Sequence, residues 1–127
     1  MSRTWRWISE AVALAVHDEQ IAEHGGAPGV RDRGLLQSGL ARAQNRAAYQ
    51  EPDAADLAAA YAFAIVRDHP FIDGNKRTAL VLAEIFLADN GYALNADDTD
   101  ILKAVLGLTD SSMTEKDFAI WMRSRLR

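Results

Sequence analysis

One stretch, residues 69–90, constrains the fold more than any other part of the chain. Its first six residues, His-Pro-Phe-Ile-Asp-Gly, contain a proline and a glycine and predict a short loop. From Asn75 onward the pattern is typical of a helix that is apolar on nearly every face and that ends near Asn90. Because a helix that is apolar all round must be surrounded by other elements, we predict a loop that leads into a buried central helix.

The first turn of this helix has a different character. It carries Gly74, Asn75, Lys76 and Arg77, so free backbone N–H groups, the positive end of the helix dipole and two cations meet at one point. Such a point binds anions, and phosphates in particular. We therefore predict a phosphate-binding site formed by these four residues.

Two further side chains precede this site. The imidazole of His69 can accept a proton from a hydroxyl group near neutral pH. The lone carboxylate of Asp73 suits Mg²⁺, which prefers one or two carboxylates together with phosphate oxygens and water. Alternatively, both side chains only satisfy backbone groups of the loop. The combination of base, metal ligand and phosphate site in one short segment favours the functional interpretation.

Residues 69–77 resemble the signature loop of the Fic/Doc family, His-x-Phe-x-Asp/Glu-Gly-Asn-Gly/Lys-Arg. Lys76 matches the Doc branch, since the adenylylating Fic branch has glycine at this position. The resemblance implies an all-α fold in which the loop joins two helices. It also implies that the loop presents the phosphates of a nucleotide to a hydroxyl group on a target protein.

The resemblance extends over most of the chain, from about residue 8 to about residue 92. Four further stretches carry it: Val16–Asp18, His24–Gly29, Arg31–Leu36 and Ala48–Tyr49. It implies one Fic/Doc domain over residues 1–127, and a chain of this length is long enough to bury a hydrophobic core.

Composition limits the class of protein. No cysteine is present, so the chain has neither a disulfide framework nor a thiolate metal site. The formal charge of −4 argues against general nucleic-acid binding, which needs a basic face. No apolar run reaches the roughly 18 residues of a membrane span, and the start of the sequence lacks the order of a signal peptide. We therefore expect a cytoplasmic protein that binds neither nucleic acid nor membranes.

Alanine, leucine and charged residues dominate, which predicts a mainly helical chain. Apart from the helix at Asn75, we expect helices over Thr4–His24, from Asp32 or Gly34 to Asn45, over Asp53–Asp68, and from the acidic run at 97–100 through Leu108. A capping box from Ser112 to Glu115 predicts the start of the last helix.

Several polar residues outside the signature loop have two interpretations. His17 is expected to be a histidine at the edge of the core that bonds to a neighbour, rather than a base or ligand. Four arginines form the most basic local stretch: Arg31, Arg33, Arg42 and Arg46. They either form a solvated helix face or help to hold the target or the nucleotide. Arg67 contacts phosphate or target, or it caps the C-terminus of its own helix.

The break in the helical pattern at Asn45–Gln50 also has two interpretations. In the Fic/Doc family, a flap upstream of the signature loop pairs with an extended segment of the target and adds it as a strand. By its position this segment is the expected flap. A plain connection between two helices is the alternative.

The resemblance implies a specific reaction. ATP would bind with Mg²⁺ at Asp73 while residues 74–77 hold its phosphates, and His69 would take the proton of a Ser or Thr hydroxyl that attacks phosphorus. In the adenylylating branch, glycine and a second arginine stand where this chain has Lys76 and Leu80. Both differences favour a Doc-like protein kinase that transfers the γ-phosphoryl group to elongation factor Tu and arrests translation. Transfer of AMP and a non-catalytic binding role are the alternatives.

The resemblance also implies a mode of control. The family's inhibitory helix, Ser/Thr-x-x-x-Glu-Gly/Asn, engages the second arginine. Residues 111–115 match its first part, but Lys116 follows and Leu80 replaces that arginine. We therefore expect no self-inhibition of this kind. We expect instead a toxin-antitoxin system, with a separately encoded antitoxin of the Phd type that covers a groove on this protein.

Overall fold

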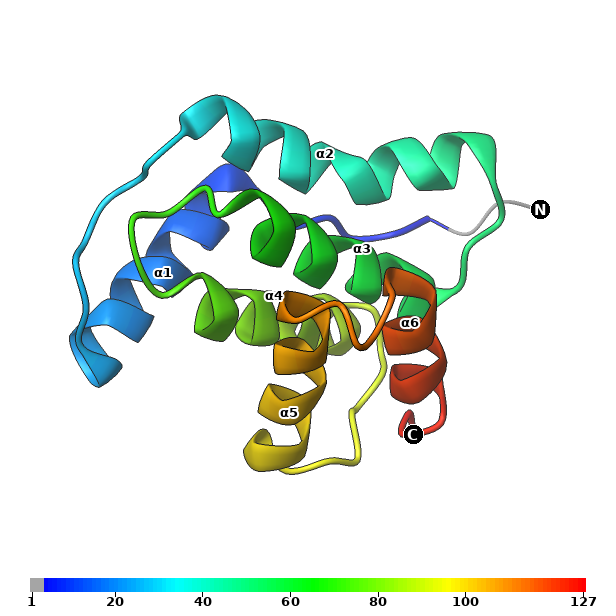
Figure 1. Ribbon diagram of the computed structural model, residues 1–127. Helices are drawn as coiled ribbons and strands as arrows, with labels where there is room; N and C mark the ends of the chain where they lie inside the picture. Colours follow the sequence, from blue (N-terminus) through cyan, green and yellow to red (C-terminus); the bar gives the residue numbers. More distant parts are fainter. Residues whose placement is uncertain (1–3) are drawn as a thin grey trace.

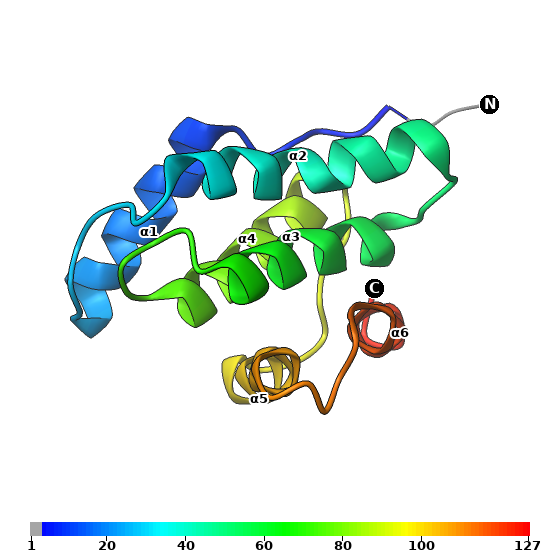
Figure 2. The ribbon, with the colours of Figure 1, turned by 45° about the horizontal axis from the view of Figure 1, so that its top comes forward.

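The computed structural model describes residues 4–127, which form six helices and no strand longer than an isolated bridge (Figure 1). The helices are α1 (Glu10–His24), α2 (Arg33–Tyr49), α3 (Ala54–Asp68), α4 (Asn75–Asp89), α5 (Asp98–Thr109) and α6 (Glu115–Arg123). In Figure 2, α6 is seen nearly end-on while α2, α3 and α4 are seen from the side, so the axis of α6 is steeply inclined to the axes of these three helices. The predicted all-α class is confirmed.

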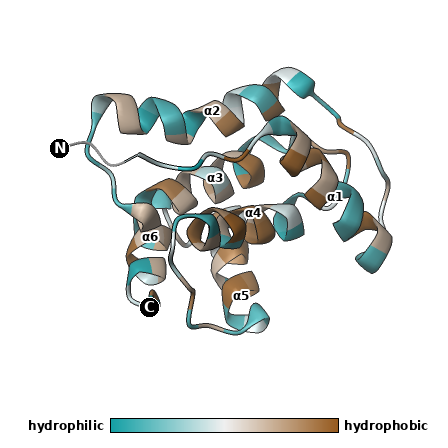
Figure 3. Cartoon of the chain, turned by 180° about the vertical axis from the view of Figure 1, so that it is seen from behind, coloured by the Kyte–Doolittle hydropathy of each residue, from teal (hydrophilic) through white to brown (hydrophobic). Residues whose placement is uncertain are grey.

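The most deeply buried helix is α3. Eleven of its 15 residues are buried, and it packs against α2, α4, α5 and α6. Six of its first nine residues are alanine, which lets neighbouring helices approach closely. The expected central helix, α4, is buried on one broad face and lies directly against α3. Figure 3 shows brown, apolar segments along α4 and α5 and teal, polar segments on the outer parts of α1 and α2.

The first helix begins at Glu10, not at Thr4 as predicted. The hydroxyl of Ser9 accepts a hydrogen bond from the N–H of Val12 at 3.1 Å and caps the helix. The residues before Ser9 instead run along the core, where two tryptophan rings pack against the ring of Phe86. A tertiary contact therefore replaces the extra turns that local helix propensity predicted.

The segment Asn45–Gln50 is not the expected flap. Helix α2 continues through Tyr49, four residues beyond its predicted end. The side chain of Arg46 holds this last turn, because it pairs with Asp56 of α3 and with Glu115 of α6. The alternative, a plain connection between helices over the same residues, is also wrong for residues 45–49, which are helical, and the actual connection spans only residues 50–53.

Helices α3 and α5 begin next to Asp53 and next to the acidic run at 97–100, as predicted, and each has an acidic cap. The carboxylate of Asp53 accepts the N–H of Asp56 at 2.9 Å, and the Asp56 carboxylate accepts the N–H of Asp53 at 3.1 Å. Asp97 caps α5 through the N–H of Asp100 at 2.8 Å. These local signals determine where each helix starts.

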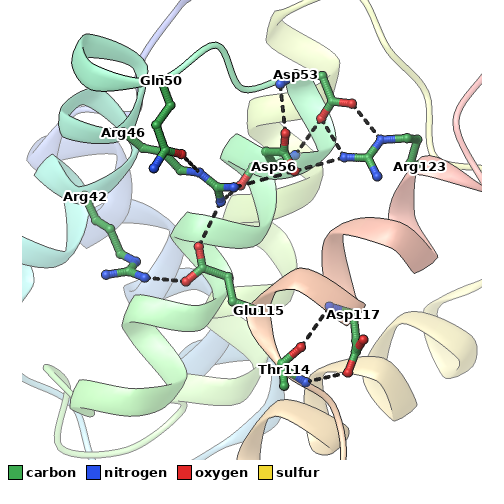
Figure 4. A network of polar contacts seen from close by, with 9 residues as sticks. All are labelled: Arg42, Arg46, Gln50, Asp53, Asp56, Thr114, Glu115, Asp117 and Arg123. Carbon is green, nitrogen blue, oxygen red and sulfur yellow. Dashed lines mark hydrogen bonds and ion pairs between the residues drawn. The ribbon is translucent and has the colours of Figure 1, made fainter.

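The cap of α6 differs from the prediction. Thr114 and Asp117 form the capping box, in place of the expected Ser112 and Glu115. Glu115 instead points away from its own helix start toward the arginines of α2 (Figure 4). Its tertiary ion pairs with these arginines outweigh a local cap.

A polar network ties α2, α3 and α6 together (Figure 4). The carboxylate of Glu115 pairs with Arg42 and accepts the Nη1–H of Arg46 at 3.1 Å. The guanidinium of Arg123 donates to Asp53 at 2.6 and 3.0 Å and to Asp56 at 2.9 Å. The network thus links the N-terminal cap of α3 to the last turn of α6.

Among the residues that the structure describes, no helix combines the length and apolar character needed to cross a membrane.

Candidate active site

The signature loop joins α3 to α4 and forms a surface depression of about 310 Å³. Its lining consists of the loop and the first turn of α4: His69, Ile72, Asp73, Gly74, Asn75, Lys76 and Arg77. Every predicted site residue in 69–77 therefore faces one space. Its volume is at the lower end of the roughly 300–1,000 Å³ of small-molecule pockets, which is enough space for phosphate groups.

His69 has an unusual backbone conformation. It ends α3 with φ 47° and ψ 57°, in the left-handed region, where its N–H donates to the carbonyl of Ile65 at 3.1 Å. Histidine, asparagine and aspartate enter this region more readily than other non-glycine residues, but it still carries a strain of about 1 kcal/mol. The conformation leaves the imidazole exposed at the edge of the depression.

Arg31 holds this strained turn from outside. Its Nε–H donates to the carbonyl of His69 and its Nη2–H to the carbonyl of Asp68, both at 2.6 Å. A cation here also interacts favourably with the negative end of the α3 dipole. Of the four arginines in the basic stretch, Arg31 is the one that contacts the signature loop.

The extended segment 29–32 lies beside the loop. The N–H of Arg31 donates to the carbonyl of Pro70 at 2.7 Å, and the N–H of Ile72 donates to the carbonyl of Gly29 at 3.1 Å. Val30 and Phe71 form an antiparallel bridge between these hydrogen bonds. The sequence analysis did not predict this pairing. The segment has too few apolar residues between its glycines and proline to show the alternation that is typical of a strand.

Asp73 is exposed and is held by two backbone groups. Its Oδ1 accepts the N–H of Gly74 at 2.9 Å and its Oδ2 accepts the N–H of Ala27 at 3.2 Å. A carboxylate has about four lone-pair sites, so both oxygens keep capacity for a cation. The described part of the chain has no group of three or more metal-ligating side chains. A lone carboxylate beside the predicted phosphate site fits Mg²⁺, which takes its other ligands from phosphate and water.

The N-terminus of α4 is open. Gly74 has φ 75° and ψ 18°, and no side chain caps the helix. The first helical hydrogen bond runs from the N–H of Thr78 to the carbonyl of Gly74 at 3.0 Å. The three N–H groups before Thr78 therefore point out of the helix end, next to Lys76 and Arg77. This arrangement is suited to an anion.

The side chain of Asn75 has a different part in the site. It is buried, its Oδ1 accepts the N–H of Phe71 at 3.1 Å, and its Nδ2–H donates to the carbonyl of Phe71 at 3.0 Å. Its amide therefore shapes the loop, and only the backbone N–H of Asn75 is left to contact a phosphate. That contact stays a prediction.

Arg67 is not among the residues that line the depression. Its guanidinium donates to the carboxylate of Asp68 at 2.8 and 3.1 Å and lies 5.0 Å from the ring centroid of Phe63. These hydrogen bonds lower the pKa of Asp68 below its ordinary value. Arg67 lines a separate groove of about 910 Å³ between α2, α3 and α6, together with Arg42 and Arg46. Arg67 therefore does not line the depression, and its contact with phosphate or target stays a prediction.

A model of the Fic/DOC family matches residues 7–87, which include both the signature loop and the extended segment beside it. The chain belongs to the Fic/Doc family. Among the relatives of this Fic/Doc protein is "Protein kinase doc" of Escherichia phage P1, which is 35% identical over 119 residues, or 93% of this chain and 94% of the relative. Another is "Toxin Doc" of Mycolicibacterium smegmatis (strain ATCC 700084 / mc(2)155), which is 46% identical over 77 residues, or 58% of each chain.

Proposed function

We propose that this Fic/Doc protein is a toxin that transfers the γ-phosphoryl group of ATP to a Ser or Thr hydroxyl of a target protein. One observation carries the proposal: an exposed imidazole, an exposed carboxylate and an open helix N-terminus surround one depression. The relative from phage P1 is named a protein kinase, which supports the same class of reaction.

Each residue has a separate task in this reaction. The N–H groups at the start of α4, with Lys76 and Arg77, bind the phosphates. Asp73 would hold Mg²⁺, and the ion would supply neutralisation of charge on the phosphate oxygens. His69 accepts the proton of the hydroxyl as its oxygen bonds to the γ-phosphorus, and the bond from that phosphorus to the bridging oxygen breaks to release ADP.

Two residues favour phosphoryl transfer over AMP transfer. Lys76 adds bulk and charge at the position where the adenylylating branch has glycine. Leu80, at the position of the second arginine, is only 5% exposed and is packed in the core. The site thus lacks the second cation that would bind a γ-phosphate. Its absence disfavours an arrangement in which the α-phosphate lies next to the imidazole of His69.

The proposed target is elongation factor Tu, as the resemblance to the Doc branch implies. The element beside the loop is the segment 29–32, not Asn45–Gln50. We place the target's extended segment along 29–32, because these residues already pair with the signature loop and a strand added beside them would lie next to the loop that carries His69. Modification of the target would arrest translation.

The partner that controls the toxin is an antitoxin of the Phd type. The two relatives named Doc support a toxin-antitoxin pair. Glu115, in the segment that resembles part of an inhibitory helix, is engaged with Arg42 and Arg46 and does not line the depression. Control by a separate protein is therefore favoured over self-inhibition.

The test is mass spectrometry of elongation factor Tu after incubation with the protein and Mg²⁺-ATP. A phosphoryl-sized increase on a Ser or Thr residue is expected. An AMP-sized increase would replace the kinase proposal with nucleotidyl transfer, and an unmodified target together with an unmodified bacterial extract would favour a non-catalytic binding role.

The matched variants are His69→Asn and His24→Asn. Asparagine tolerates the left-handed conformation at position 69, so the first variant keeps the fold but loses the base. Transfer should fall by at least about a hundredfold, as is usual when a general base is lost. His24 is an exposed histidine at the end of α1, outside the depression, and its replacement should leave transfer unchanged.

A further inference from the structure

His17 is a buried histidine of α1 that the proposed reaction does not use. Its side chain is 1% exposed. Its ring stacks on Phe71 of the signature loop, with centroids 3.9 Å apart and an interplanar angle of 6°. Its Nε2 lies 2.8 Å from the carbonyl oxygen of Asp73. Since a carbonyl can only accept, Nε2 carries the hydrogen and donates it.

This hydrogen bond acts on one particular peptide group, the one between Asp73 and Gly74. The oxygen of that peptide accepts the hydrogen of His17, and its N–H donates to the carboxylate of Asp73 at 2.9 Å. A peptide group is rigid and planar, so holding the direction of its oxygen also holds the direction of its N–H. His17 thereby orients the Asp73 carboxylate without touching it.

Packing around the same peptide is close. A Cβ added at Gly74 would lie 3.0 Å from the Cδ1 of Ile21 and 3.7 Å from the Nε2 of His17. A Cβ added at Gly26 would lie 2.8 Å from the Oδ2 of Asp73. Helix α1 and the residues after it therefore hold the second half of the signature loop, as Arg31 holds the first half.

We infer that His17 is a positioning residue for the metal-binding carboxylate: its Nε2–H aligns the Asp73–Gly74 peptide and so aims the Asp73 side chain at Mg²⁺ bound with ATP. The inference rests on the proposed function, which assigns Mg²⁺ to Asp73. The competing explanation is that His17 only fills space between α1 and Phe71. That explanation requires the ring but not its donor.

Three substitutions separate these explanations. His17→Phe keeps a flat ring against Phe71 and removes the donor. His17→Gln removes the ring but places an amide N–H where Nε2 was. His17→Asn also carries an amide, but its shorter side chain ends near the Nδ1 position and does not reach the carbonyl of Asp73.

The readout is the affinity for β,γ-imido-ATP, measured by isothermal titration calorimetry once with Mg²⁺ and once with EDTA. The ratio of the two dissociation constants reports the contribution of the metal and requires neither a target protein nor turnover. Circular dichroism and thermal melting of each variant show whether it is folded. Asp73→Asn gives the ratio that remains when the metal ligand itself is lost.

We expect His17→Gln to keep the wild-type ratio of dissociation constants within about twofold. We expect His17→Phe and His17→Asn to lower this ratio about tenfold, toward the value for Asp73→Asn. An unchanged ratio in His17→Phe would overturn it. If His17→Phe does not fold, the Gln and Asn variants decide, and equal ratios in these two would overturn it. A ratio near one for the wild-type protein would overturn both this inference and the proposed metal role. The wild type is measured first, so this outcome is known before any His17 variant is made.

Discussion

The guanidinium of Arg31 and the backbone carbonyl of His69 are joined by a hydrogen bond of 2.6 Å. The two residues are 38 positions apart, and the bond connects the loop before α2 to the proposed catalytic turn. The same guanidinium also binds the carbonyl of Asp68. A strained backbone conformation persists when surrounding contacts hold it, and Arg31 supplies these contacts at the end of α3.

Arg31→Ala should therefore lower both the stability of the fold and the rate of catalysis. Loss of two charge-assisted hydrogen bonds on an exposed surface is expected to lower the free energy of unfolding by about 1–2 kcal/mol. Release of the His69 turn is expected to lower phosphoryl transfer about tenfold or more, because the imidazole is no longer held toward the depression. Urea unfolding and transfer of labelled phosphate from ATP to the target measure the two effects.

The control for Arg31 is Arg33→Ala. Arg33 belongs to the same basic stretch, but it is exposed and pairs with Glu10 of α1, away from the loop. This variant should keep the transfer rate of the wild type. An equal loss of activity in both variants would show that general surface charge, not the contact with His69, is responsible.

Asn75→Asp should destabilise the signature loop. The Nδ2–H of Asn75 donates to the carbonyl of Phe71 in a site that is 7% exposed. Aspartate keeps the shape but sets a carboxylate oxygen against that carbonyl, so the free energy of unfolding should fall by about 2 kcal/mol. Chemical denaturation followed by circular dichroism measures the change. Asn45→Asp, on the exposed face of α2, should stay within about 0.5 kcal/mol of the wild type, and a matching loss there would contradict the explanation.

Glu115→Ala should weaken the attachment of α6 to α2. The Glu115 side chain is 14% exposed and compensates both Arg42 and Arg46. Its removal leaves two partly buried cations without this partner, and we expect a loss of about 1–3 kcal/mol in the free energy of unfolding. Lys116→Ala, one residue later and exposed, is the matched control. Equal thermal midpoints for the two variants would rule out a stabilising role for the network.

The pair of Asp53 and Arg123 should make stability depend on pH in the acid range. Hydrogen bonds from Arg123 lower the pKa of Asp53 from 3.8 to about 2, so the folded state favours the charged carboxylate. The stabilisation is complete above the unfolded pKa and is lost as the pH falls from about 4 to about 2. Arg123→Gln should therefore be less stable than the wild type at pH 7, with a difference that shrinks between pH 4 and pH 2.

Thermal melting of the wild type and Arg123→Gln across this pH range measures the effect. Asp53 is half exposed, so added salt should reduce the difference at pH 7 by screening. A difference that is constant from pH 7 to pH 2 would show that Arg123 acts through packing and not through the charge of Asp53.

Local sequence patterns predicted most of the helices. The start of α3 after Asp53, the end of α1 at His24 and the change from loop to helix at Asn75 each depend on neighbours within a few residues, and all three lie where expected. The errors occur where distant residues compete with these patterns. Glu115 leaves a predicted capping box for the arginines of α2, and α2 continues to Tyr49 because Arg46 has partners in α3 and α6.

The sequence by itself determined the contents of the candidate site, because the imidazole, the carboxylate and the open helix N-terminus are all within residues 69–77 and a single loop-to-helix turn brings them together. Only the tertiary structure decided what holds that turn in place. Arg31 and His17 reach it from the loop before α2 and from α1, and neither residue has a local pattern that names its partner. Helix periodicity and capping operate over a few residues, whereas these contacts depend on how the helices pack, which the whole chain determines.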